Sequence, residues 1–358
     1  MSTSEVALFQ QMLTDLAAQG VSDLYLRPAM LPLVRRDGEL EQLAGQTVVS
    51  DIFLEAILAW LLTPEQKQKL ESEKQLTIGY TFANHLRLRL NVFYQHGLPE
   101  LTIRFVPLRI KKVSELGLPP NLEQLMSANS GLVIISGPYG SGRSATIAAL
   151  LQTINNTSAR HIVTIEEPIE YVFTSNKSVI DQREVGQDVN SWEAALQSLP
   201  QEDCDVVVLG KVPRPALAAQ ALELAAAGKL VLMAAEADST VKCLERLVTS
   251  FLPDEQTRIR DRLGEVLLAV LAQQLIKRIG GGRLAVTELL LGTPAVRNIV
   301  REGKFYQLNN VLQISRDEGM LAFDYNLAEL VKTGLVQAEE AALYVHDNDL
   351  FNSFMRSL

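Results

Sequence analysis

The chain has 358 residues, more than a single hydrophobic core usually organises, so we expect two domains. Its 33 Lys and Arg residues stand against 42 Asp and Glu, a net charge of −9. This balance argues against nucleic-acid binding through a basic surface and favours protein partners. Two cysteines and four histidines supply neither a disulfide framework nor a metal cluster.

The N-terminal residues MSTSEVALFQQ lack the basic and then apolar pattern of a signal peptide. No apolar run reaches the length of a membrane-spanning helix. These features and the scattered cysteines predict an intracellular protein.

Hydrophobic periodicity and turn signals predict a small α+β domain at the start of the chain. Asp37-Gly38 is typical of a hairpin turn, and Ser50 and Thr63-Pro64 are typical helix starts. The predicted elements are a helix at 5–19, strands at 23–26, 33–36 and 39–43, helices from 50 and 63, and strands at 77–82, 86–94 and 101–105.

A charged, proline-bearing segment, Val106 to Pro120, then predicts a linker. We therefore divide the chain into a first domain at 1–107, a linker at 108–120 and a second domain at 121–358. Short apolar runs separated by helical stretches predict a parallel α/β sheet in the second domain, with mostly helices beyond residue 250. The predicted strands are 132–135, 162–165, 206–209, 230–234 and a pair around 280–282; helices are predicted from 293 and at 337–345 and 347–358.

The stretch GLVIISGPYGSGRSA, residues 131–145, predicts a strand, a glycine-rich loop and a helix, the pattern of a phosphate-binding P-loop. The flanking strand and helix disfavour the alternative of a chance glycine-rich loop. Arg143 stands where the motif GxxxxGK[ST] has lysine, and the Ser144 hydroxyl stands where a Mg²⁺ ligand belongs. The predicted phosphate-binding residues are Gly137, Gly140, Ser141, Gly142, Arg143, Ser144 and Ala145.

Eight short motifs occur along nearly the whole chain. They are SDLYL at 22–26, RLRLN at 87–91, RFVP at 104–107, TIEEPIEY at 164–171, QREVG at 182–186, IGGGR at 279–283, GTPAVRNIVREGK at 292–304 and EGM at 318–320. Together these motifs resemble those of the retraction ATPases of type IV pili, the PilT and PilU family of secretion ATPases. The most specific match is GTPAVRNIVRE, which resembles a C-terminal signature of retraction motors.

The resemblance implies a PAS-like α+β N-terminal domain and a RecA-like P-loop domain with a helical C-terminal part. It further implies ATP with Mg²⁺ as cofactor, a homohexamer with nucleotide sites between neighbours, and a cytoplasmic place beside the inner membrane. The implied partners are other copies, an active PilT-like ATPase and the inner-membrane platform protein, without direct nucleic-acid contact. Arg87, Arg89 and Arg104 match arginines that in the family lie toward a neighbour's nucleotide; the alternative is that they form polar strand faces.

The chain departs from the family at its catalytic positions. In DVVVLGK, residues 205–211, Lys211 replaces the glutamate that would orient and deprotonate water. Arg143 keeps a positive charge, but its planar guanidinium does not replace a compact ammonium conservatively. Further departures are Lys229 and Glu236 at two histidine positions and Gln197 and Gln201 at two arginine positions. Pro200 also falls inside an expected helix, where it predicts a break.

The acidic motif TIEEPIE is retained. Glu166 matches its first acid and Glu167 replaces an aspartate; both could lie near metal or water, or form a solvated turn. We expect Lys211 to pair with Glu166 or Glu167, and Lys229 with Glu236, against the alternative that these side chains extend into solvent.

We interpret the chain as a PilT/PilU-like pilus motor subunit with a degenerate nucleotide site and weak or absent ATP binding. It is then a hydrolysis-defective structural or regulatory component. The alternative is an active retraction ATPase with a rewired site; a role in DNA uptake would follow from retraction and is not separable from it here.

Overall fold

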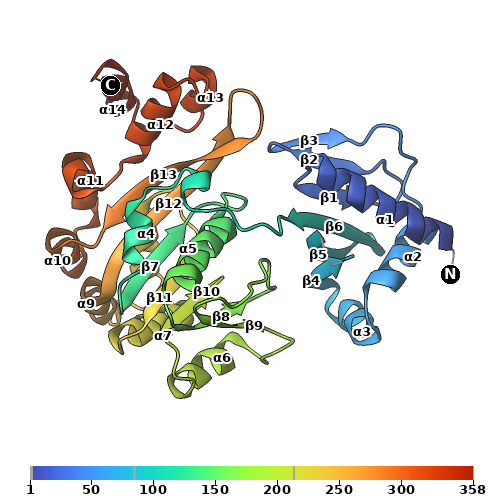
Figure 1. Ribbon diagram of the computed structural model, residues 1–358, viewed down its shortest axis with the longest axis horizontal. Coiled ribbons are helices and arrows are strands. Elements are labelled where there is room, and N and C mark those ends of the chain that lie inside the picture. Colours follow the sequence, from blue (N-terminus) through green and yellow to red (C-terminus); the bar gives the residue numbers. More distant parts are fainter. Residues whose placement is uncertain (1–2, 84–85, 213, 358) are drawn as a thin grey trace. The chain divides into compact units, whose positions relative to one another are not determined.

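The computed structural model describes residues 3–83, 86–212 and 214–357 (Figure 1). Its contacts divide the chain into two units. The N-terminal unit comprises Met1–Arg109 together with Pro168–Val172, and the second unit comprises Ile110–Glu167 and Phe173–Leu358.

The N-terminal unit contains a six-stranded antiparallel sheet in the order β3-β2-β1-β6-β5-β4. Its helices bury Phe9, Leu13 and Leu54 against strand residues such as Leu24 and Leu90. The elements are α1 (Thr3–Ala18), β1 (Asp23–Leu26), β2 (Leu33–Arg36), β3 (Glu39–Gln42), α2 (Asp51–Leu61), α3 (Pro64–Glu73), β4 (Gln75–Phe82), β5 (Leu86–Gln95) and β6 (Leu98–Val106).

Local signals in this unit act as the sequence predicts. Asp37 and Gly38 both adopt positive φ, 48° and 93°, in the turn that joins β2 and β3. The Ser50 hydroxyl accepts a hydrogen bond from the Phe53 amide at the start of α2. Thr63 and Gln66 form a complete capping box at the start of α3.

The second unit contains a seven-stranded sheet in the order β13-β12-β7-β11-β10-β8-β9, in which all neighbours are parallel except β12 and β13. Its strands are β7 (Gly131–Ser136), β8 (His161–Glu166), β9 (Val179–Glu184), β10 (Val206–Leu209), β11 (Leu230–Ala235), β12 (Leu267–Lys277) and β13 (Arg283–Leu291). Its α-helices are α4 (Asn121–Leu125), α5 (Arg143–Thr157), α6 (Trp192–Ser198), α7 (Pro215–Ala226), α8 (Thr240–Thr249), α9 (Gln256–Val266), α10 (Pro294–Glu302), α11 (Leu308–Ile314), α12 (Phe323–Lys332), α13 (Ala338–Ala342) and α14 (Asn348–Ser357).

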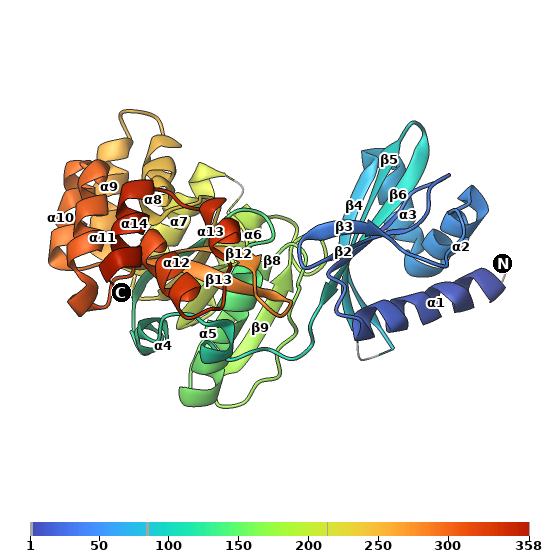
Figure 2. The same cartoon turned by 90° about the horizontal axis from the view of Figure 1, so that it is seen from above.

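Successive strand residues pack on opposite faces of this sheet, so each face has its own core. Figure 2 shows the helices on the two sides of the sheet. Val133 and Ile135 pack with α4 and α5, whereas Leu132 and Ile134 pack on the side of α6, α7, α8 and α9. A third cluster joins β12 and β13 to α12, α13 and α14. Both faces of the central strands are therefore covered, which explains their continuous apolar sequences.

Two differences from the sequence prediction have physical causes. Strand β9 was not predicted, because its sequence VIDQRE is polar, and it lies at the edge of the sheet, where few of its side chains are buried. Val113 and Leu118, inside the predicted linker, are buried in the core of the second unit. The helix break predicted at Pro200 is confirmed: α6 ends at Ser198, and the chain continues only as a short 3-10 turn. Among the described residues, no helix is both long and apolar enough to cross a membrane.

Candidate nucleotide site

The glycine-rich loop connects the carboxyl end of β7 to the first residue of α5. Gly140 and Gly142 have φ of 79° and 92°, in the left-handed region that favours glycine. A Cβ on Gly137 would overlap the Ser141 side chain and the Gln273 carbonyl. The backbone thus has the compact form that directs successive amides and a helix N-terminus toward an anion.

Gln273 of β12 holds this loop from the neighbouring strand. Its side-chain amide donates to the Ser141 carbonyl at 2.7 Å and accepts from the Thr146 hydroxyl at 2.8 Å. Gln273 and Thr146 are both buried. The sequence analysis missed Gln273 because it lies more than 120 residues after the loop and belongs to no motif.

Arg143 is the residue of the loop that departs most in chemistry from the P-loop motif. Its guanidinium donates to the Ala235 carbonyl at 2.5 Å and to the Glu236 carboxylate at 3.3 Å. The Arg143 side chain is only 17% exposed, whereas that of Glu236 is 77% exposed. Both terminal nitrogens of the guanidinium therefore have acceptors within the chain. Ser144, the next residue, is exposed at the start of α5.

The acidic motif begins inside β8, whose last residue is Glu166, and β8 lies two strands away from β11. Glu166 accepts hydrogen bonds from the Thr164 hydroxyl at 2.8 Å and the Gln182 amide at 3.1 Å. The Glu167 carboxylate accepts from the Trp192 indole at 2.9 Å and lies 3.7 Å from the Lys211 ammonium. Lys211 thus pairs with Glu167, one of its two predicted partners, in an ion pair that is half exposed on both sides.

The predicted pair of Lys229 with Glu236 is wrong. Lys229 directly precedes β11 and Glu236 directly follows it, so the two residues lie at opposite ends of this strand. Six strand residues separate them by roughly 20 Å. Lys229 instead donates to the Cys204 carbonyl at 2.6 Å, and Glu236 contacts Arg143. Lys229 therefore lies at the end of the strand that is remote from the glycine loop.

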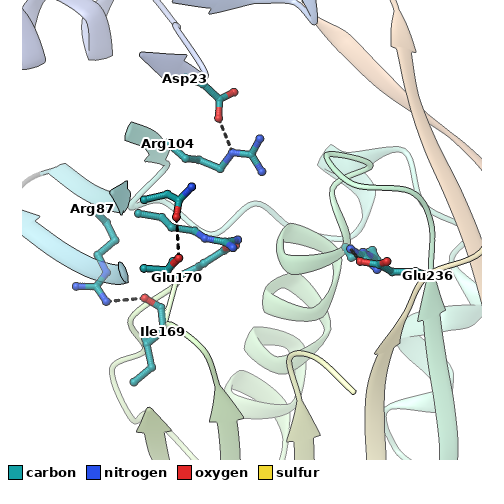
Figure 3. Close-up of polar contacts among 10 residues, drawn as sticks. Asp23, Arg87, Arg104, Ile169, Glu170 and Glu236 are labelled. Carbon is teal, nitrogen blue, oxygen red and sulfur yellow. Dashed lines mark hydrogen bonds and ion pairs between the residues drawn. The ribbon is translucent and has the colours of Figure 1, made fainter. Parts of the chain in front are cut away.

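The three N-terminal arginines have partners within their own unit (Figure 3). Arg104 contacts Asp23 at 2.8 Å, and Arg89 contacts Glu170 at 2.9 Å. Arg87 donates to the Ile169 carbonyl at 2.5 Å and to the Thr81 hydroxyl at 3.0 Å.

Cys243 lies close to the loop, but its thiol is unreactive. Burial raises the pKa of its thiol to about 11, although the Ser136 hydroxyl and nearby arginines oppose the shift. The thiol is therefore protonated at neutral pH and does not act as a nucleophile. Among the described residues, no cluster of His, Cys, Asp and Glu could hold a metal ion by itself.

The residues present fit part of an ATP–Mg²⁺ site. The loop backbone suits a phosphate group, and the exposed Ser144 hydroxyl suits a metal bound together with that phosphate. Arg143, bound to Ala235 and Glu236, and Lys211, bound to Glu167, differ from the side chains that phosphoryl transfer normally uses.

A parallel sheet with helices on both faces, a glycine loop after a buried strand and charged groups after three neighbouring strands define a RecA-like P-loop protein. The profile described as "Type II/IV secretion system protein" matches residues 3–281, and the chain belongs to this family.

Within the family the chain is similar to two proteins of Pseudomonas aeruginosa. It is 34% identical over 331 residues to "Type IV pilus retractation ATPase PilT", covering 92% of this chain and 96% of that protein. It is 30% identical over 344 residues to "Type IV pilus ATPase PilU", covering 96% and 90%. The solved structure "Crystal Structure of the Pilus Retraction Motor PilT and Bound ADP" matches with a TM-score of 0.84 and 32% identity, covering 96% of this chain and 98% of that one.

Proposed function

We propose that this chain is a type IV pilus motor subunit that has lost efficient ATP hydrolysis and acts as a structural or regulatory component. Its similarity to PilT and PilU over nearly the full length supports the place in the pilus machine. The observation that supports the proposed loss of hydrolysis is that Arg143, the cation of the loop, binds the Ala235 carbonyl and the Glu236 carboxylate of its own chain.

Lys211 supports the same conclusion through the activation of the attacking water. An ammonium in place of the catalytic glutamate cannot take a proton from water while it is itself protonated. Loss of such a base typically costs two to four decades in rate. We therefore propose that Mg-ATP binds weakly or not at all and that turnover is at background.

The assembly we propose is a homo-oligomer, a hexamer, or a mixed ring with an active PilT-like ATPase. The PAS-like character of the N-terminal domain and contact with the inner-membrane platform protein belong to this proposal. The proposed location is the cytoplasmic side of the inner membrane.

One observation favours the alternative of an active, rewired motor. The loop keeps a backbone suited to phosphate, and Ser144 remains exposed beside it. In this alternative Glu166, which accepts bonds from Thr164 and Gln182, would act on water or metal.

Phosphate release from Mg-ATP by the purified chain decides between these two functions. We expect background rates for the wild type and little gain for the double variant Arg143→Lys, Lys211→Glu, because Glu236 still stands at the histidine position beside the glycine loop. Steady release at roughly 1 per second, an ordinary enzymatic rate, would establish the active motor instead. A melting curve with and without Mg-ATP measures binding separately, since a ligand of the native state raises the melting temperature.

A further inference from the structure

The segment Pro168–Val172 belongs to the N-terminal unit, although it lies between β8 and β9 in the sequence. It directly follows Glu166 and Glu167, which belong to the second unit. We infer that β4 and β5 form a specific docking site for this segment, and that the site keeps Arg87 and Arg89 engaged within the chain.

Arg87 provides the first contact of this site. Its guanidinium donates to the Ile169 carbonyl (Figure 3). A second nitrogen donates to the Thr81 hydroxyl at 3.0 Å. Because Thr81 and Arg87 are cross-strand partners in β4 and β5, the sheet itself fixes the direction of the guanidinium. A main-chain carbonyl is thus bound by a pre-oriented charged donor.

Gly79 of β4 makes room for this contact. A Cβ at this position would overlap the Arg87 guanidinium and lie 3.0 Å from the Ile169 carbonyl oxygen. Gly79 has no left-handed φ, so the turn chemistry of the backbone does not explain glycine here. The missing side chain instead lets the Arg87 side chain and the docked segment approach the strand closely.

Arg89 provides the second contact, an ion pair with Glu170 at 2.9 Å. The Glu170 side chain is only 15% exposed, so its charge would be stranded in a poorly solvated place without Arg89. Tyr171, the next residue, is half-buried; burial, and then the charge of Glu170, raise the pKa of its phenol to about 12. The docked segment therefore presents a carbonyl and a carboxylate to two arginines that are two residues apart on one strand.

This site has a consequence for the arginines. Arg87 binds the Ile169 carbonyl and Arg89 binds the Glu170 carboxylate. While the segment remains docked, the two arginines are therefore unavailable to an anion from outside the chain. The segment is thus an internal competitor for Arg87 and Arg89, independent of whether the glycine loop binds nucleotide.

Charge reversal in the full-length chain tests this inference. We expect Arg89→Glu and Glu170→Arg each to raise hydrogen exchange of the backbone amides from Ile169 to Val172 severalfold, and to speed chymotryptic cleavage after Tyr171. The double variant should return both rates close to those of the wild type, because the ion pair is restored with opposite polarity. Glu193→Gln, which breaks the separate Arg214–Glu193 pair in the second unit, is the matched control and should leave these rates unchanged.

Gly79→Ala tests the site without changing any charge, and should also raise exchange in this segment. Unchanged exchange in both single charge variants, or a double variant that is as exposed as the two singles combined, would overturn the inference. If Gly79→Ala lowers overall stability, the charge-reversal cycle decides alone. ATP turnover enters none of these measurements, so their outcome is separate from that of the proposed function.

Discussion

At the scale of single residues, the two cations near the glycine loop that depart from the family pattern form ion pairs within the chain. Arg143 binds Glu236, and Lys211 binds Glu167, so two cations have carboxylates from the same chain. Exposed pairs of this kind contribute little, about 0 to 1 kcal/mol. The contact of Arg143 with the Ala235 carbonyl differs, because the arginine side chain is largely buried.

We predict that Arg143→Ala lowers the free energy of unfolding by about 1.5 to 3 kcal/mol, the range for a hydrogen bond from a charged group. Glu236→Gln, the matched change at the exposed partner, should lower it by less than about 1 kcal/mol. Urea denaturation measures both values. Equal effects of the two variants would contradict the assignment of the Ala235 carbonyl as the main acceptor.

Glu288 of β13 predicts a dependence of stability on pH. Burial raises the pKa of its carboxyl above 4.5, although the amide and hydroxyl of Thr240, both at 2.7 Å, favour the charged form. A raised pKa in the folded state stabilises the protein below the unfolded pKa, and this contribution is lost as pH rises through the folded pKa.

Glu288→Gln keeps a carbonyl acceptor for Thr240 but does not titrate. We therefore expect the stability of this variant relative to the wild type to increase as pH rises from about 4 through the region above the ordinary glutamate pKa. Unfolding measured across this range, with the exposed Glu245→Gln of α8 as control, checks the sign. A difference that falls with rising pH would show that the bonds from Thr240 outweigh burial.

The sequence predicts the local features of the fold and of the site well, and their long-range contacts poorly. The hairpin at Asp37-Gly38, the capping box at Thr63 and the glycine loop depend on residues a few positions apart, and each is confirmed. The contacts of Gln273 with the loop and of Arg143 with Ala235 join segments about 90 or more residues apart. Only the strand order, which places β12 and β11 on either side of β7, brings those groups together.

At the scale of secondary-structure elements, the C-terminal signature has a clear structural role. Arg297 of α10 donates to the Gly292 and Glu265 carbonyls, and Arg301 donates to the Gly264 carbonyl. Gly264 and Glu265 lie in the last turn of α9, where carbonyls lack partners within the helix. The two arginines therefore cap α9 at the point where β12 begins.

We predict that Gln273→Leu, a change in the β12 residue that contacts the glycine loop, destabilises this loop. It leaves the Ser141 carbonyl and Thr146 hydroxyl without their partner, at about 1 to 3 kcal/mol for each buried group. The neighbouring Gln274→Leu, whose side chain points to the opposite side of the strand, is the control. Hydrogen exchange of residues 137–146 and urea denaturation provide the measurements. Equal effects of the two variants would exclude a specific role for Gln273.

At the scale of the whole molecule, the chain passes from the N-terminal unit to the second unit through a short exposed stretch. Residues 107–109, 111 and 112 are exposed, whereas Val113 and Leu118 are buried in the second unit. The domain boundaries at 107 and 121 stay a prediction, but this burial anchors the predicted linker in the core of the second unit from Val113 onward.

Limited trypsin treatment should therefore cut first at Arg109, Lys111 or Lys112, because proteases act on exposed chain with few contacts. Fragment masses identify the bond. Lys177, an exposed basic residue of the second unit, is the internal comparison. Earlier cleavage at Lys177 would show that the stretch before Val113 is protected.

The docked segment also makes the order of synthesis relevant to folding. Pro168 follows Arg109 by 59 residues, so the N-terminal unit leaves the ribosome without one of its own parts. At about 5 to 20 residues per second, the segment is made roughly 3 to 12 seconds later. Through that interval Arg87 and Arg89 lack the Ile169 carbonyl and the Glu170 carboxylate. The nascent N-terminal unit is therefore a more cationic and less complete body than the same residues in the finished chain.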